Sequence, residues 1–148
     1  MKQISLNVID YDIKDINPIW WKKIISLFLK PQKHFEIRCW RQEKYAINQA
    51  LMYGTLCQNN STPYEVSITG VLNKEIINQI LNTPISTDYN RTTDFFTVNI
   101  DDNFCSTHYG SEIYIYDLTD DIVDAIKEII LPNINFFSLG IDFMSINE

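Results

Sequence analysis

One segment of the chain places a thiol and an imidazole three residues apart, in Cys105 and His108. A cysteine beside a histidine can act as an activated nucleophile, and Asp101 or Asp102 could orient the ring. On a strand, however, residues three apart point to opposite faces, so this pair meets only across a bulge or a turn. We therefore interpret Cys105 as a small buried residue, and keep a small cytosolic enzyme using Cys105 and His108 as an alternative.

The sequence lacks other patterns that carry chemistry. It contains no G-x-G-x-x-G, no Walker-type G-K-[ST], no H-E-x-x-H and no C-x-x-C, and its 4 glycines are isolated. Four residues have side chains of the types that bind zinc, but they lack the short spacings that structural zinc sites use: Cys39, Cys57, Cys105 and His108. Three widely spaced cysteines indicate free thiols in a cytosol. We expect no catalytic residue, no metal and no cofactor.

The last helix expected in the chain is strongly acidic. Asp120 and Asp121 lie in its first turn, where carboxylates offset the helix dipole. Asp124 and Glu128 have no such role, and like charges at i,i+4 repel by roughly a few tenths of a kcal/mol. Further residues extend this face and add two aromatic side chains: Asp101, Asp102, Asp117, Tyr114 and Tyr116. The nine residues form either a solvated surface or a docking face for a basic partner.

The net charge of −7 is unevenly distributed. Residues 1–61 hold nine Lys/Arg and five Asp/Glu, whereas residues 62–148 hold three Lys/Arg and fourteen Asp/Glu. An acidic field repels nucleic acid phosphates and anionic lipid, and it attracts basic proteins. No apolar stretch approaches the roughly 20 residues that cross a bilayer, and the start lacks a signal-peptide pattern. We expect a cytoplasmic protein that binds a basic protein and that binds neither nucleic acid nor membranes.

Hydrophobic periodicity predicts the elements that position these residues. The predicted strands cover 3–9, 35–39, 64–68, 96–100, 104–109, 112–117 and 137–143. The predicted helices cover 17–30, 42–53, 73–81 and 119–131, with Asn73 and Thr119 as N-caps and with Pro31 and Pro132 as stops. Residues 57–63 and 84–94 are predicted loops. The aromatic and basic residues 20–25 would suit a membrane-surface helix, but we interpret them as a core helix with one lysine stripe.

These elements predict an α+β fold with a single mixed sheet and helices on one face, with the N-terminal helix either among them or elsewhere. From residue 64 onward, with 104–109 and 112–117 counted as one bent strand, the predicted order is strand, helix, strand, strand, helix, strand, which is the split βαβ or ferredoxin-like order. The length of 148 residues fits one domain, residues 1–148. Within it we distinguish a basic part, residues 1–63, from an acidic βαββαβ part, residues 64–148.

In general character the chain resembles a bacterial immunity protein of a contact-dependent inhibition or polymorphic toxin system. The resemblance lies in a small acidic α+β domain that is poor in glycine, lacks catalytic motifs and carries an acidic face with tyrosines. It implies a protein that is not an enzyme and that neutralises a cognate toxin, often a basic nuclease, by blocking its active-site groove. Besides the enzyme named above, a non-catalytic adaptor domain is the other alternative.

Overall fold

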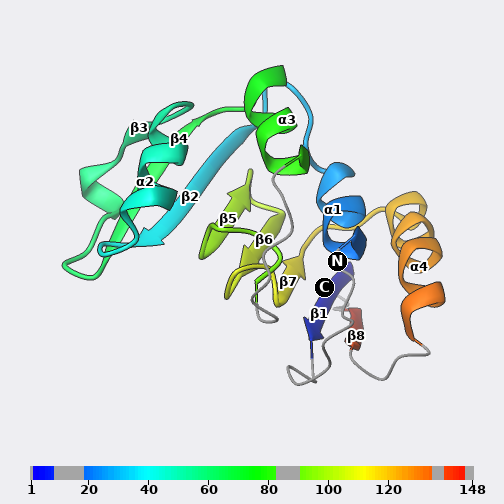
Figure 1. The fold of residues 1–148 in the computed structure, drawn as a ribbon. Coiled ribbons are helices and arrows are strands. Elements are labelled where there is room, and N and C mark those ends of the chain that lie inside the picture. The colour runs from blue at the N-terminus through cyan, green and yellow to red at the C-terminus, as the bar shows by residue number, and fades with distance from the viewer. Residues whose placement is uncertain (1, 9–18, 83–90, 135–138, 146–148) are drawn as a thin grey trace.

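The elements expected from the hydrophobic patterns recur in the computed structural model, which describes residues 2–8, 19–82, 91–134 and 139–145. The strands are β1 Lys2–Val8, β2 His34–Trp40, β3 Thr55–Leu56, β4 Glu65–Val71, β5 Thr97–Ile100, β6 Phe104–Thr107, β7 Glu112–Ile115 and β8 Leu139–Ser145. The helices are α1 Ile19–Ser26, α2 Lys44–Leu51, α3 Lys74–Asn82 and α4 Asp120–Ile134, with a short 3-10 helix η1 at Gln58–Asn60. Figure 1 shows their arrangement.

The strands form one sheet in the order β3-β4-β2-β5-β6-β7-β1-β8. Each pair of neighbours among the described residues is antiparallel. Strands β5, β6 and β7 follow one another through tight turns, and β1 lies between β7 and β8. The predictions of an α+β fold and a single sheet are confirmed, whereas neighbouring strands are antiparallel rather than mixed.

The ferredoxin-like order is not confirmed, although its building unit occurs twice. Strands β4 and β5 flank α3 and run in the same direction with β2 between them, because β2 is antiparallel to both. Strands β7 and β8 flank α4 in the same way, with β1 between them. In the ferredoxin-like order, the strand between the two parallel strands of each unit comes from the other unit. Here that middle strand is β2 in one unit and β1 in the other, and both come from the N-terminal part.

The apolar face of the sheet and the helices share one core. Buried residues alternate along the strands, as in Phe35, Ile37 and Cys39 of β2. All four helices contribute side chains to the same buried cluster, so they pack on this face. Trp21 of α1 is fully buried, and its Nε1 donates a hydrogen bond of 2.9 Å to Oγ of Ser106 on β6.

Several predicted element ends are confirmed and others are wrong. Asn73 Oδ1 accepts from Ile76 N at 3.0 Å and Thr119 Oγ1 accepts from Ile122 N at 3.4 Å, so both N-caps are confirmed. Helix α1 ends at Ser26 rather than at residue 30, because Leu27 N donates to the i−3 carbonyl and tightens the chain into turns.

Two further predictions concern proline positions. Helix α4 continues through Pro132 to Ile134, so the predicted stop there is wrong. Proline removes a single helical hydrogen bond, and its fixed φ is itself helical, so a last half-turn can follow it. The predicted start of the first helix at residues 17–18, and the predicted loop as far as residue 90, lie outside the described residues.

Candidate functional site: the open face of the sheet

The face of the sheet opposite the helices carries the polar side chains of the strands. Register places one row of them across six strands: Thr69, Glu36, Asn99, Cys105, Tyr114 and Ser5. These residues alternate with the core residues, so they point away from the helices. In the described residues the helices bury their apolar sides in the core, which leaves this row, the open face, without a helical cover.

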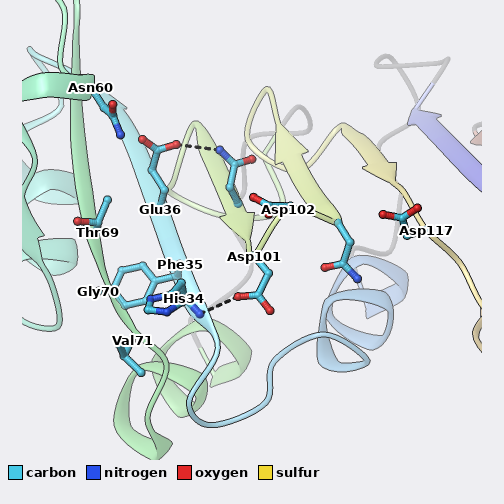
Figure 2. Close-up of a pocket in the computed structure, with 12 residues that line it drawn as sticks. His34, Phe35, Glu36, Asn60, Thr69, Gly70, Val71, Asp101, Asp102 and Asp117 are labelled. Carbon is cyan, nitrogen blue, oxygen red and sulfur yellow. Dashed lines mark hydrogen bonds between the residues drawn. The ribbon is translucent and has the colours of Figure 1, made fainter.

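A groove of about 1010 Å³ lies at one end of the open face, across β4, β2 and β5. Its lining combines carboxylates, amides and a few apolar groups: His34, Phe35, Glu36, Asn60, Thr69, Gly70, Val71, Asn99, Asp101, Asp102, Asn103 and Asp117. Figure 2 shows the carboxyl groups of Glu36, Asp102 and Asp117 spread across neighbouring elements at this groove. The groove is therefore acidic and rich in hydrogen-bond acceptors.

Glu36 is held in place as an ionised carboxylate. Its Oε1 accepts from Asn99 Nδ2 at 3.0 Å, and its Oε2 accepts from the Ser67 hydroxyl and from Arg38 Nη1 at 3.1 Å. Burial raises the pKa of the Glu36 carboxyl, but the hydrogen bonds from Ser67 and Asn99 and the charge of Arg38 outweigh it, so the pKa is lowered. Glu36 is thus a fixed anion and is poorly suited to proton transfer near neutral pH.

The turn between β5 and β6 forms the next wall of the groove. Asp101 has a positive φ of 46° and extends the β2 ladder, because its Oδ1 accepts from His34 N at 2.9 Å and its own N donates to His34 O. Asp102 is exposed at the tip of the turn. Asn103 Oδ1 is buried and has no hydrogen-bond partner among the described residues. Such an orphan acceptor is costly unless water or a ligand satisfies it.

Asp117 is placed beside this turn by the backbone. Tyr116 N donates to Asn103 O at 2.9 Å, which extends the β6–β7 pairing by one step. The next residue, Asp117, takes a φ of 54° and is exposed at the rim of the groove. Asp101, Asp102 and Asp117, which the sequence analysis assigned to one acidic face, therefore lie around one groove.

The carboxylates of the last helix lie in the helical layer instead. Asp120, Asp121, Asp124 and Glu128 are all exposed on α4, whose buried side contributes Ile126 and Ile130 to the core. The tyrosines belong to the sheet: Tyr114 lies on the open face, half-buried, and Tyr116 follows β7. The structure thus divides the nine predicted residues between a helix surface and the open face of the sheet.

His108 pairs with a different carboxylate from the one expected. Its Nδ1 lies 3.2 Å from Glu112 Oε2, and the Tyr114 hydroxyl donates to the same oxygen at 3.1 Å. Among the described contacts none joins Cys105 to His108. Burial, and then the charges of Glu36 and Glu112, raise the pKa of the Cys105 thiol, which disfavours the thiolate that a nucleophile needs. All three cysteines are free, as expected.

An aromatic cluster lies at the end of the sheet where β2 ends and β5 begins. The Phe96 ring lies 4.8 Å from Trp40, 5.2 Å from His108 and 5.3 Å from Tyr109, measured between centroids. Arg91 stacks over the Tyr109 ring at 3.9 Å. The Tyr109 hydroxyl donates to a carboxylate, that of Glu43, at 2.9 Å. These contacts tie the start of α2 to the β6–β7 turn.

Sequence reasoning missed the fixed anion and its donors, namely Glu36, Ser67, Asn99 and Arg38. Each looks like an ordinary outward-facing residue of a half-buried strand, and Ser67 and Asn99 are 31 and 63 residues from Glu36. The His108–Glu112 pair has a local signal, a spacing of four residues across a turn. The sequence analysis considered only Asp101 and Asp102 as partners of His108.

Within the described ranges no group of three or more His, Cys, Asp or Glu side chains is placed to hold a metal ion. No helix in the same ranges is long and apolar enough to cross a membrane. No protein family model matches the chain, and no curated protein or solved structure matches it either.

Proposed function

We propose that this chain is an immunity-type protein that binds a basic protein toxin and neutralises it without chemistry. The observation that supports this most directly is a surplus of exposed carboxylates in the C-terminal part: Asp101, Asp102, Asp117, Asp120, Asp121, Asp124 and Glu128. Like charges at this density cost stability. The helix dipole accounts for Asp120 and Asp121 and the hydrogen bond from His34 N accounts for Asp101, so a partner of opposite charge gives the remaining carboxylates a reason to be present.

The mechanism in this proposal is steric and electrostatic. A toxin that cleaves nucleic acid has a basic substrate groove, and an acidic domain seated in that groove excludes the substrate. Opposite charges also raise the rate of association, by factors of about 10 to 10³ at low ionic strength. The proposal includes a cytoplasmic location, which the free thiols favour.

A small enzyme is the less supported alternative. The raised pKa of the Cys105 thiol weakens it as a nucleophile, and His108 is oriented by Glu112 without reaching that thiol. A non-catalytic adaptor domain shares the binding proposal but has no toxin as its partner.

The test is capture of partners from the native host by the full chain, followed by identification with mass spectrometry. The expected result is a basic protein whose association rate falls steeply between low and physiological ionic strength, because exposed charges are screened within about 8 Å at 0.15 M salt. Loss of the captured protein's activity on binding would identify a toxin. Capture of an acidic protein, or an association rate that does not change with salt, would contradict the proposal.

A further inference from the structure

We propose that the groove on the open face is the recognition site for the partner and that its occupant is an arginine side chain of that partner. This inference rests on the proposed function and names the place and the chemistry of binding. It is carried by a sheet face that no helix of the described residues covers, by the groove in that face, and by a lining that offers acceptors to a cationic donor.

The first argument is the set of acceptors. A carboxylate offers about four lone-pair sites, and three donors occupy sites on Glu36, which leaves about one on Oε1. Asn99 donates a side-chain amide N–H to Glu36, and its side-chain carbonyl oxygen, Oδ1, can accept a hydrogen bond. Asn103 Oδ1 has no hydrogen-bond partner among the described residues, but this atom is itself buried, so a ligand in the groove does not reach it directly in this conformation. A ligand that satisfies Glu36 Oε1 and Asn99 Oδ1 has to donate at least two hydrogen bonds at once.

The second argument is charge. The fixed anion Glu36 lies in the groove, and Asp101, Asp102 and Asp117 are exposed around it. Arg38 is the basic side chain that contacts Glu36, and it also lies 3.6 Å from Glu65, so it neutralises only part of this field. The occupant should therefore be a cation.

The third argument separates arginine from other cations. The guanidinium is planar, always charged, and has five N–H donors and no acceptor, which suits acceptors on two neighbouring side chains such as Glu36 and Asn99. A lysine ammonium is a strongly hydrated point charge with three donors. Val71, 44% exposed at the groove, offers an apolar contact for the methylenes of an arginine stem.

The probe is N-acetyl-arginine amide, titrated into the full ¹⁵N-labelled chain, with N-acetyl-citrulline amide as a neutral ligand of nearly the same shape. The expected result is saturable shifts in the side-chain amide signals of Asn99 and Asn103 and in the backbone amide of Asp102. Citrulline should bind about tenfold more weakly, because hydrogen bonds between charged groups are stronger than neutral ones. Equal binding of both ligands, or shifts that avoid these signals, would overturn the proposal.

Two matched variants test the place. Asp102→Asn with Asp117→Asn, and Asp124→Asn with Glu128→Gln, each remove two exposed negative charges. The groove variant should weaken arginine binding about tenfold, whereas the α4 variant should change it less than about twofold, since α4 lies outside the groove. If both variants weakened arginine binding equally, the ligand would be attracted by the general electrostatic field of the protein and not by a site in the groove. Glu36→Gln is a third variant, with its unfolding followed in parallel because three donors depend on this carboxylate.

The failures of the two proposals are distinguishable. If the arginine probe does not bind but a basic partner is captured with salt-dependent association, the groove assignment is wrong and the proposed function stands. If the probe binds at the groove but the captured partner is not basic, the groove is a cation site and the immunity function is wrong.

Discussion

Gly110, in the turn between β6 and β7, should not tolerate even a methyl group. Its φ is +86°, and a Cβ there would lie 1.8 Å from Thr92 Oγ1 and 2.9 Å from Trp21 Nε1. A non-glycine residue in a left-handed conformation costs roughly 1–2 kcal/mol. Displacing Thr92 loses its hydrogen bond to Tyr109 O at 3.1 Å, worth about 1 kcal/mol, and overpacking adds about 1–3 kcal/mol.

Gly110→Ala should therefore lower the free energy of unfolding by about 3–6 kcal/mol, a large part of the roughly 5–15 kcal/mol of a natural domain. The assay is urea unfolding followed by tryptophan fluorescence, to which the buried Trp21 contributes. Adding Thr92→Ala should restore part of the loss, because it removes the overlapping hydroxyl. A Gly110→Ala protein within about 0.5 kcal/mol of the parent would refute the reasoning. A double variant that regains nothing would exclude the Thr92 hydroxyl as the cause and leave the backbone conformation and the contact with Trp21.

Three further predictions concern charge and thiols. The lowered pKa of Glu36 means that its contribution to stability is present above its ordinary value of 4.5 and is lost as the pH falls through the lowered pKa. In acid unfolding, the free energy of unfolding of the parent should therefore fall more steeply below pH 4.5 than that of the Glu36→Gln variant. Asp124→Lys with Glu128→Lys should leave the thermal midpoint unchanged or slightly higher, because it relieves i,i+4 repulsion on an exposed face, and a clear drop in a calorimetric scan would contradict this. Burial raises the pKa of Cys39 to about 12, so peptide mapping after iodoacetamide treatment of the folded protein should find Cys57, which is half-buried, labelled well before Cys39.

The existence of the elements could be predicted from the sequence because it depends on local pattern. Alternation such as that in β2, and caps such as Asn73 and Thr119, are visible in a few consecutive residues. The two-residue strand β3 was not predicted, because two residues carry no period. Its two backbone positions pair with β4 across a loop, which local pattern does not encode.

The order of the strands could not be predicted in the same way. Each half of the chain offers strands of similar apolar character, and the choice of neighbour depends on contacts between residues far apart. Thus β1 pairs with β7 and β8, from the other end of the chain. The groove could not be predicted for the same reason, since Glu36, Asn99 and Asp117 come together only when β2, β5 and β7 are in the same sheet.

The two acidic surfaces should affect different steps of binding to a basic partner. Charges on α4 act through space during approach, so removing Asp124 and Glu128 should lower the association rate at low salt and leave dissociation nearly unchanged. Asp102 and Asp117 line the groove, so removing them should also speed dissociation, because they would contact the bound cation. Surface plasmon resonance at two ionic strengths separates the two rates. An α4 variant that dissociates faster than the groove variant would place the contact on the helix, and the open face would then be outside the interface.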